Sequence, residues 1–260
     1  MASSALVHGL LYEHKNLDKN YKLNSPSPTE GGELVVLKKI NGYIRNQGHA
    51  IDITVGRHTF KNVYGANKVE GTPKADIALV CYDKKTGKFY DACFISHKMG
   101  RDASGFQQYS GITPKADGAQ RGSISEDKNV VEFLKSLSSL HESVVKGKHR
   151  YYTVVEDKKL IGKSIYGPLF GSRNFGVDNI HLIGQGDPVF RKIGKTHRLE
   201  FSANMSLNPD VSEFKKQDYT TIIGARYSSG RNYEVNGKVY QGVRVLIMPQ
   251  KLIGSKAIKI

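Results

Sequence analysis

Apolar positions along this chain follow a helical period in two places. Near the start, positions 36, 37, 40, 43 and 44 are apolar, and this spacing predicts a helix from Glu33 to Ile44. The same period, with serine and aspartate at its start, predicts an amphipathic helix from Ser125 to Val145. Both predicted helices have one apolar face, so each must pack against another element.

Short apolar runs predict strands elsewhere. Two of them, Asp76–Tyr82 and Phe89–Ile95, flank a polar turn, and this arrangement predicts a β-hairpin. Near the end of the chain, 219–227 and 238–248 are joined through Asn236-Gly237, a strong tight-turn signal that predicts a second hairpin. Further strands are expected at 51–55, 58–63, 151–155 and 179–183.

The order of these elements predicts an α/β fold, with a mixed central sheet flanked by helices on both faces and a C-terminal β-hairpin extension. We expect one domain, since 260 residues can bury one large core. Its expected parts are an N-terminal lead-in at 1–28, a core at 29–200, and a β-rich extension at 201–260 packed on the same domain. The sequence has no run of eighteen apolar residues and no basic leader before a long apolar run, so we expect a soluble cytoplasmic protein.

The charge balance narrows the class of partner. The chain has 39 Lys and Arg against 24 Asp and Glu, a net charge of +15. Such an excess favours a polyanionic partner, because neutralised phosphates release counterions. From Lys158 to Arg198 the chain is rich in glycine and cations with interleaved aromatic residues, which suits a nucleic-acid groove; solvated irregular loops are the alternative. The expected nucleic-acid contacts are Lys163, Arg173, Arg191, Lys192 and Lys195.

The sequence lacks the motifs of several other function classes. The two cysteines, Cys81 and Cys93, lie inside predicted strands rather than in a spaced metal motif, so a four-ligand structural zinc is not expected. The sequence has no Gly-Lys-Ser/Thr phosphate loop, no His-Glu-x-x-His arrangement and no Gly-x-Ser-x-Gly elbow. Nucleotide hydrolysis, zinc-dependent proteolysis of that type and serine catalysis are therefore disfavoured.

The first predicted hairpin brings an acid and a base together. If its strands pair across 84–87, Asp76 lies beside Ser96, His97 and Lys98 at the end of the second strand. A carboxylate can hold a divalent metal that polarises a phosphate and acidifies a water, while the lysine orients that water or steadies developing charge. The pair therefore suits phosphodiester hydrolysis, with a surface salt bridge as the alternative.

These residues resemble the core of the PD-(D/E)xK nuclease superfamily, and most closely its phage-encoded and restriction-enzyme branches. The resemblance covers about residues 30–185. It rests on Pro73-Lys74-Ala75-Asp76, the hairpin, Ile95-Ser96-His97-Lys98 and the helix-like segment 103–109. It implies that Asp76 is the metal-binding aspartate, that Lys98 is the motif lysine, and that Ser96 replaces the usual second acid.

Some similar members of the superfamily recruit a glutamate from the preceding helix, which here would be Glu33. A first-turn acid that complements the helix dipole is the alternative. The resemblance also implies the main-chain carbonyl of His97 as a metal ligand. Gln107 and Gln108 match polar positions on the helix that follows the lysine.

Taken as a whole, the resemblance implies a restriction-endonuclease-like fold and a Mg²⁺-dependent DNA endonuclease, with Mn²⁺ as a substitute metal. A phage or restriction-system origin is implied, with the host cytoplasm or the virion as location. The implied partners are DNA and either a second copy of the chain or virion proteins, with no membrane. The alternative is a non-catalytic virion structural or DNA-packaging protein that retains the fold, and Ser96 is the residue that keeps it open.

Overall fold

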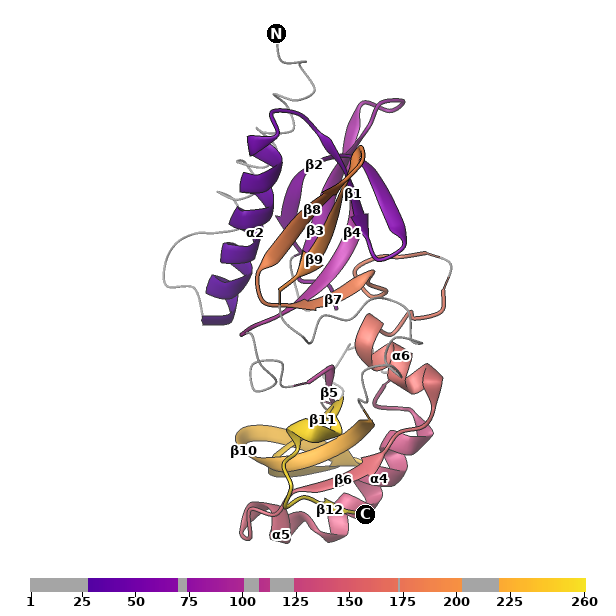
Figure 1. Ribbon diagram of the computed structural model, residues 1–260. Helices are drawn as coiled ribbons and strands as arrows, with labels where there is room; N and C mark the ends of the chain where they lie inside the picture. Colours follow the sequence, from indigo (N-terminus) through magenta and orange to yellow (C-terminus); the bar gives the residue numbers. More distant parts are fainter. Residues whose placement is uncertain (1–27, 70–73, 101–107, 113–123, 173, 203–219) are drawn as a thin grey trace. The chain divides into compact units, whose positions relative to one another are not determined.

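The chain forms two compact units, each with its own sheet (Figure 1). The structure is a computed structural model that describes residues 28–69, 74–100, 108–112, 124–172, 174–202 and 220–260, and only the backbone of 28–31. The first unit is Met1–Phe106 with Gly171–Asp210, and the second is Gln107–Phe170 with Val211–Ile260. In these described ranges, no helix is both long and apolar enough to cross a membrane.

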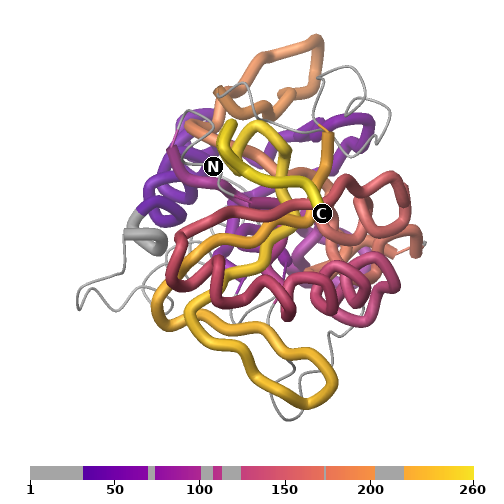
Figure 2. The backbone as a smooth tube through the Cα atoms, turned by 90° about the horizontal axis from the view of Figure 1, so that it is seen from below, coloured from indigo at the N-terminus to yellow at the C-terminus, as the bar shows by residue number. Residues whose placement is uncertain are grey.

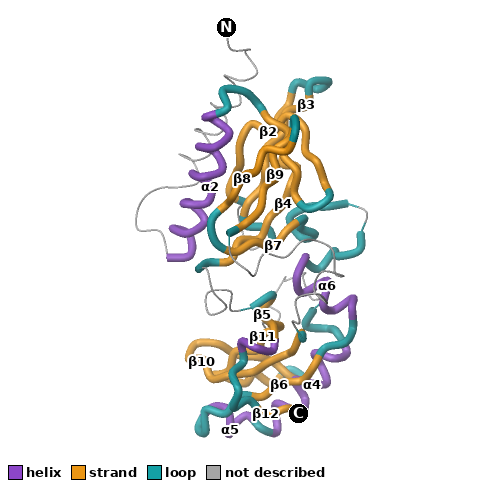
Figure 3. The backbone as a smooth tube through the Cα atoms, in the orientation of Figure 1, coloured by secondary structure: helices purple, strands orange, loops and turns teal. Residues whose placement is uncertain are grey.

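The first unit contains a seven-stranded mixed sheet in the order β7-β4-β3-β2-β1-β9-β8 (Figure 3). Its strands are β1 (Ile51–Val55), β2 (His58–Lys68), β3 (Ile77–Asp83), β4 (Lys88–Lys98), β7 (Leu182–Gln185), β8 (Pro188–Ile193) and β9 (Thr196–Phe201). The pairs β1·β9 and β4·β7 are parallel, and the other neighbours are antiparallel. The first five residues of β3 are all buried, which explains why this strand is a continuous apolar run.

Helix α2 (Pro28–Asn46) lies along this sheet (Figure 1). Its apolar side chains, such as Leu37 and Ile40, are fully buried in the core that the helix shares with the strands. The buried Asn41 side chain accepts a hydrogen bond from the Ala66 N–H at 2.6 Å and donates one to the Ala66 carbonyl at 3.1 Å. These two bonds fix the C-terminal half of the helix against β2.

The second unit contains a five-stranded mixed sheet in the order β12-β6-β10-β11-β5. Its strands are β5 (Ser110–Ile112), β6 (Tyr151–Val154), β10 (Thr221–Val235), β11 (Lys238–Pro249) and β12 (Ile258–Lys259). Its helices are α4 (Lys128–Ser139), α5 (His141–Val145), α6 (Lys158–Tyr166) and the 3₁₀ turn η1 (Gln250–Leu252). Helices α4 and α5 pack on β10 and β11, whose two strands run side by side to the tip of a long hairpin (Figure 2).

The mixed α/β class and both predicted hairpins are confirmed. Strands β3 and β4 pair from Ile77 opposite Ile95 to Asp83 opposite Lys88. At the tip of the C-terminal hairpin, Asn236 and Gly237 have φ values of 50° and 78°, the left-handed conformation that a two-residue turn of this kind requires. The apolar runs and the turn residues between them therefore predicted both hairpins correctly.

Several boundaries differ from those expected. The helix expected at 125–145 is interrupted at Leu140, whose φ of −105° and ψ of 5° are not helical. The strand expected at 179–183 begins at Leu182 and continues through Gln185, because Gly184 and Gln185 pair with the end of β4. The segment from Lys158 to Arg198 is not a set of irregular loops, since it contains α6, β7, β8 and the first half of β9.

The division into parts also differs from the expected one. The C-terminal hairpin pairs with β6 and β5 in the second sheet, so residues 107–170 group with it rather than with the core expected at 29–200. Helices on both faces of one sheet are not what the described residues contain: α2 packs on the first sheet, while α4 and α5 pack on the second. Sequence periodicity cannot show which sheet a strand joins.

Candidate active site

Asp76 lies immediately before β3, between the ends of two neighbouring strands. Its N–H donates to the Ile95 carbonyl at 2.9 Å, and its carbonyl accepts from the Val69 N–H at 3.0 Å. Its carboxylate Oδ2 accepts from the Ser96 hydroxyl at 2.9 Å and from the His97 N–H at 2.7 Å. The expected meeting of Asp76 with the end of β4 is confirmed. Oδ1 accepts no hydrogen bond from any described residue, so it can take a ligand.

Lys98 ends β4 and is the cation that the sequence predicted for this group. Burial lowers the pKa of Lys98, while the carboxylates of Asp76 and Glu33 oppose that shift. Within the described ranges, its ammonium makes no direct hydrogen bond or ion pair. A charge that is largely removed from water without a direct partner is unfavourable. Such a group with a shifted pKa is typical of a functional site rather than of a surface salt bridge.

Glu33 reaches the same end of the sheet from α2. Its carboxylate lies 3.8 Å from the Lys68 ammonium, and its side chain is 13% exposed. Lys68 ends β2 and pairs in register with Ile77, next to Asp76. The predicted helix start was wrong, because α2 begins at Pro28 and Glu33 is therefore beyond the first turn. The helix dipole acts mainly in that turn, so the capping alternative gains no support.

His97 presents its main chain to Asp76. Because the N–H and C=O of one strand residue face the same neighbour, the His97 carbonyl lies on the Asp76 side of β4. The imidazole is engaged elsewhere: Nε2 lies 3.0 Å from the Gly186 carbonyl, and Nδ1 has no hydrogen-bond partner among the described residues. Burial lowers the pKa of His97, which favours the neutral ring with Nε2–H donating to Gly186.

Lys74 is a member of this group that the sequence analysis did not single out. Burial holds the pKa of Lys74 well below its usual range, the positive charge of Lys98 lowers it further, and Asp76 opposes both effects. Strand alternation gives the available signal: Lys74 precedes Asp76 by two residues, and continuing the β3–β4 register would place it opposite Lys98. Lys68 escaped notice because the predicted strand ended at Val63, five residues too early.

The remaining expected site residues belong to the second unit, to another hairpin of the first unit, or to the residues outside the described ranges. Gln107 and Arg173 fall outside the described residues. Gln108 belongs to the second unit, where its amide lies close to Gly111. Lys163 is on α6 of the second unit. The other three expected nucleic-acid contacts, Arg191, Lys192 and Lys195, are exposed on the β8–β9 hairpin of the first unit, where Arg191 lies 3.3 Å from Glu200.

The oxygen atoms of this group suit a magnesium ion. In the part of the chain that is described, no three or more His, Cys, Asp or Glu side chains cluster as a metal site. Mg²⁺ does not require such a cluster, because it is usually bound by one or two carboxylates together with waters and substrate phosphates. Asp76 Oδ1, the Glu33 carboxylate and the His97 carbonyl are donors of that kind. The donor set therefore fits Mg²⁺.

The fold and this group define a mixed α/β protein with two carboxylates and partly buried lysines at the ends of neighbouring inner strands. The chain is similar to the type II restriction enzyme CviJI of Paramecium bursaria Chlorella virus IL3A, with 31% identity over 195 residues. The similarity covers 72% of this chain and 51% of the relative, so the chain spans about half the length of the curated relative that it matches. No protein-family model matches the chain, and no solved structure matches it.

Proposed function

We propose that this chain is a Mg²⁺-dependent DNA endonuclease of the PD-(D/E)xK type. The observation that carries the proposal is the Asp76 carboxylate, held at Oδ2 by two donors from β4 and open at Oδ1, beside the partly buried Lys98. Glu33 is close enough to Lys98 to raise the pKa of that lysine. Carboxylates and a lysine in this arrangement suit phosphodiester hydrolysis.

Asp76, Glu33 and the His97 carbonyl are the residues that would hold Mg²⁺. When bound, the ion would polarise the scissile phosphate and lower the pKa of a water. Ser96 takes the position of the usual second acid and acts as a positioning residue, because its hydroxyl fixes the rotamer of Asp76. Glu33 then supplies the second carboxylate from α2.

Lys98 contacts the reacting groups in this proposal. Its ammonium donates a hydrogen bond to the attacking water or to a non-bridging phosphate oxygen, and it stabilises the negative charge that grows there. The water loses a proton and forms a P–O bond, the ester P–O bond breaks, and the leaving oxygen gains a proton. The products are a phosphate monoester and a hydroxyl group.

DNA as substrate is supported by the similarity to a restriction enzyme and by the net charge of +15. The viral source of that relative fits a virus-encoded enzyme that acts in the host cytoplasm. The same similarity gives no support to a non-catalytic virion protein. We propose no membrane partner, and a second copy of the chain as the protein partner.

Incubation of circular duplex DNA with the full chain in Mg²⁺, and separately in EDTA, tests this proposal. Cleavage is expected in Mg²⁺ alone. Asp76→Asn keeps the shape of the side chain and its contacts to β4 but removes the charge, so cleavage should fall by about 10³-fold or more while DNA binding persists. A wild-type chain that never cuts DNA in Mg²⁺ or Mn²⁺, or an Asp76→Asn variant that cuts normally, would remove the proposal.

A further inference from the structure

Four arginines gather on the sheet of the second unit. Arg226 on β10 lies directly opposite Arg244 on β11, and Arg231 follows in the irregular stretch of β10 before Asn232. Arg150 immediately precedes β6, and it comes next in register after Tyr151 opposite Ala225. We call Arg150, Arg226, Arg231 and Arg244 the arginine face.

Strand alternation places the cross-strand arginines on one side of the sheet. Gly224 and Leu246 lie directly opposite each other, two residues from Arg226 and Arg244, so all four positions share a face. Leu246 packs there with Ile253, which follows η1. The Arg150 guanidinium donates to the Ile253 carbonyl at 2.8 Å, which brings Arg150 to the same face.

Among the described residues, no acid forms an ion pair with the like charges of the arginine face. Burial lowers the pKa of Arg244, and the positive charges of Arg231 and Arg226 lower it further. None of these three guanidiniums makes a hydrogen bond or an ion pair within the described ranges. Like charges directly opposite on neighbouring strands are destabilising.

The surrounding sequence has the same bias. From Thr221 to Ile260 the chain has seven Lys and Arg residues and one acid, Glu234, which pairs with Val239 farther along the hairpin. A run of this composition keeps the arginine face positive at neutral pH. The charges that neutralise it must therefore come from outside this part of the chain.

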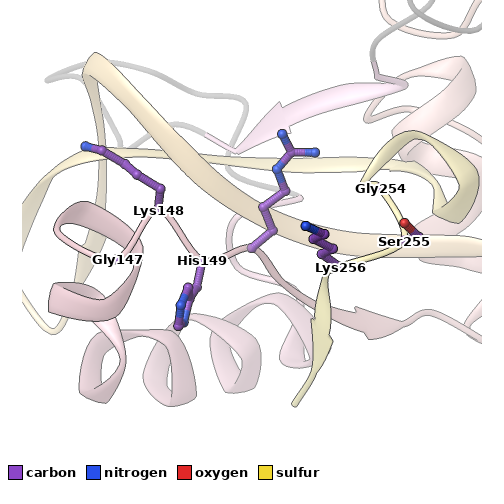
Figure 4. Close-up of a pocket in the computed structure, with 7 residues that line it drawn as sticks. Gly147, Lys148, His149, Gly254, Ser255 and Lys256 are labelled. Carbon is purple, nitrogen blue, oxygen red and sulfur yellow. The ribbon is translucent and has the colours of Figure 1, made fainter.

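A basic pocket adjoins the arginine face at Arg150. The cavity is about 480 Å³, and the turn at Gly147–His149 lies on one side of it with Gly254–Lys256 on the other (Figure 4). Its lining has four basic or imidazole side chains, Lys148, His149, Arg150 and Lys256, and no acid. Gly254 has a φ of +91°, and a Cβ atom there would lie 2.8 Å from the Arg150 guanidinium. The glycine therefore makes room for the arginine.

We propose that the arginine face, with this pocket at its edge, binds the sugar-phosphate backbone of duplex DNA. Guanidinium groups bind phosphate oxygens in bidentate fashion. Neighbouring strands are about 5 Å apart, so arginines on three of them can contact more than one phosphate. Contacts of this kind hold and orient a duplex without selecting its sequence. This inference rests on the proposed function, because it takes DNA as the polyanion.

The experiment measures binding of a short fluorescent duplex to the full chain in EDTA across a salt series. The double variant Arg226→Gln with Arg244→Gln should bind about 100-fold more weakly at low salt. The slope of log affinity against log salt should become shallower by about 2, close to the 0.9 expected for each lost phosphate contact. Arg231→Gln, at an exposed position, should lower the affinity about tenfold. This single variant replaces the double variant in the test if the double variant does not fold.

A matched control removes the same charge elsewhere in the second unit. Lys128→Gln with Lys135→Gln, both exposed on helix α4, should change affinity by less than about threefold because exposed charges outside the bound surface are screened. Arg226→Lys with Arg244→Lys keeps both charges and should keep the salt slope. Wild-type affinity and slope in the double variant Arg226→Gln with Arg244→Gln, or an equal loss in the Lys128 and Lys135 control, would overturn the inference.

Cleavage in Mg²⁺ separates this inference from the proposed function. Arginine-dependent binding without any cleavage supports the arginine face and removes the endonuclease. If the chain cleaves DNA but its DNA affinity does not depend on Arg226 and Arg244, the endonuclease is supported and the arginine face is removed. Acidic lipid vesicles that bind in place of the duplex, with the same arginine dependence, would also overturn DNA as the ligand.

Discussion

The Asp76 site and the arginine face both contain partly buried cations, but their surroundings differ in sign. Around Lys98, the carboxylates of Asp76 and Glu33 offset part of the cost of burial. Around Arg244, the neighbouring charges are Arg231 and Arg226, and they add to that cost. A site of mixed sign can hold a metal and act on a bond, whereas a site of one sign can only bind an anion. The local charge pattern therefore separates chemistry from attachment within one basic chain.

The two regions also differ in how the side chains are fixed. Asp76 is held by main-chain hydrogen bonds to two strands and by two donors at its carboxylate. Arg226 and Arg231 extend from a hairpin with no described hydrogen-bond partner for their guanidiniums. Catalysis requires groups held within about 0.5 Å, while backbone attachment tolerates looser geometry. Each region has the rigidity that its proposed task needs.

The substitution with the largest expected effect, which should separate catalysis at the Asp76 site from DNA binding at the arginine face, is at Glu33. Glu33→Gln keeps the size of the side chain but removes the second carboxylate, so Mg²⁺ affinity and cleavage rate should each fall by about 10²-fold. DNA binding in EDTA should not fall, because the arginine face is unchanged. Cleavage rates over a Mg²⁺ titration, with binding measured in parallel, check this expectation.

Glu200 provides the matched control for Glu33. It is an ion-paired glutamate of the same unit, on β9, and strand alternation turns its side chain to the face opposite that of Phe201, the β9 residue whose ring lies beside His97. Glu200→Gln should therefore leave the Mg²⁺ dependence unchanged. If Glu33→Gln also cleaves normally at every Mg²⁺ concentration, Glu33 is not a metal ligand and its place near Lys98 has only an electrostatic effect.

Local patterns predicted the parts of the site that lie on one hairpin. The apolar runs of β3 and β4 and the polar turn between them were enough to bring Asp76 beside Ser96 and His97. Such pairing depends on residues close in sequence. The position of Glu33, by contrast, depends on how α2 docks on β2 through Asn41 and Ala66, which no periodicity encodes.

The arginine face could not be predicted from the sequence pattern. The two strands of the C-terminal hairpin were predicted, but Arg226 lies opposite Arg244 only because the register is offset by an irregular stretch between Tyr227 and Asn232. Arg150 joins them through pairing of β6 with β10, which are separated by about seventy residues in sequence. Long-range pairing of this kind leaves no signal in a single sequence.

A smaller expected effect is that the stability of the first unit falls at acidic pH. His181 is buried, its Nδ1 accepts from the Phe94 N–H at 3.1 Å, and its ring stacks on Phe175 at 3.9 Å. Burial, with help from His58, lowers the pKa of His181 to about 3. The unfolded state, with a histidine pKa near 6.5, binds the proton first, so stability should fall as the pH drops from 6.5 toward 3.

Urea unfolding followed by circular dichroism at several pH values measures this loss, and the chain has no tryptophan to serve as a fluorescent probe. The loss from His181 should be on the order of a few kcal/mol. His181→Gln can still accept from Phe94 but does not titrate, so its unfolding midpoint should change less between pH 6.5 and 4. His149→Gln, an exposed histidine of the second unit, should retain the wild-type pH dependence. If the unfolding midpoints of the wild type and both variants depend equally on pH, His181 is not the group responsible for the loss of stability.

The smallest expected effect concerns the stability cost of the active-site cation. Burial outweighs the attraction of Asp76 and Glu33 in setting the pKa of Lys98, so the fold disfavours its charged form. Between that lowered pKa and the ordinary value of 10.5 the unfolded state binds more protons, and stability should rise with pH across this window. Lys98→Met removes the charge at similar length and should raise the melting temperature at neutral pH by roughly 2–4 °C, while it abolishes cleavage.

Arg244→Met is the partner experiment for the other region. It should also raise the melting temperature, because it relieves repulsion by Arg226 and Arg231, but it should leave the single-turnover cleavage rate at saturating DNA unchanged. Thermal unfolding and single-turnover cleavage of both variants test the contrast directly. A lower melting temperature for Lys98→Met would mean that its two carboxylates depend on it for stability. Loss of the single-turnover rate in Arg244→Met would mean that the arginine face takes part in the chemistry as well as in attachment.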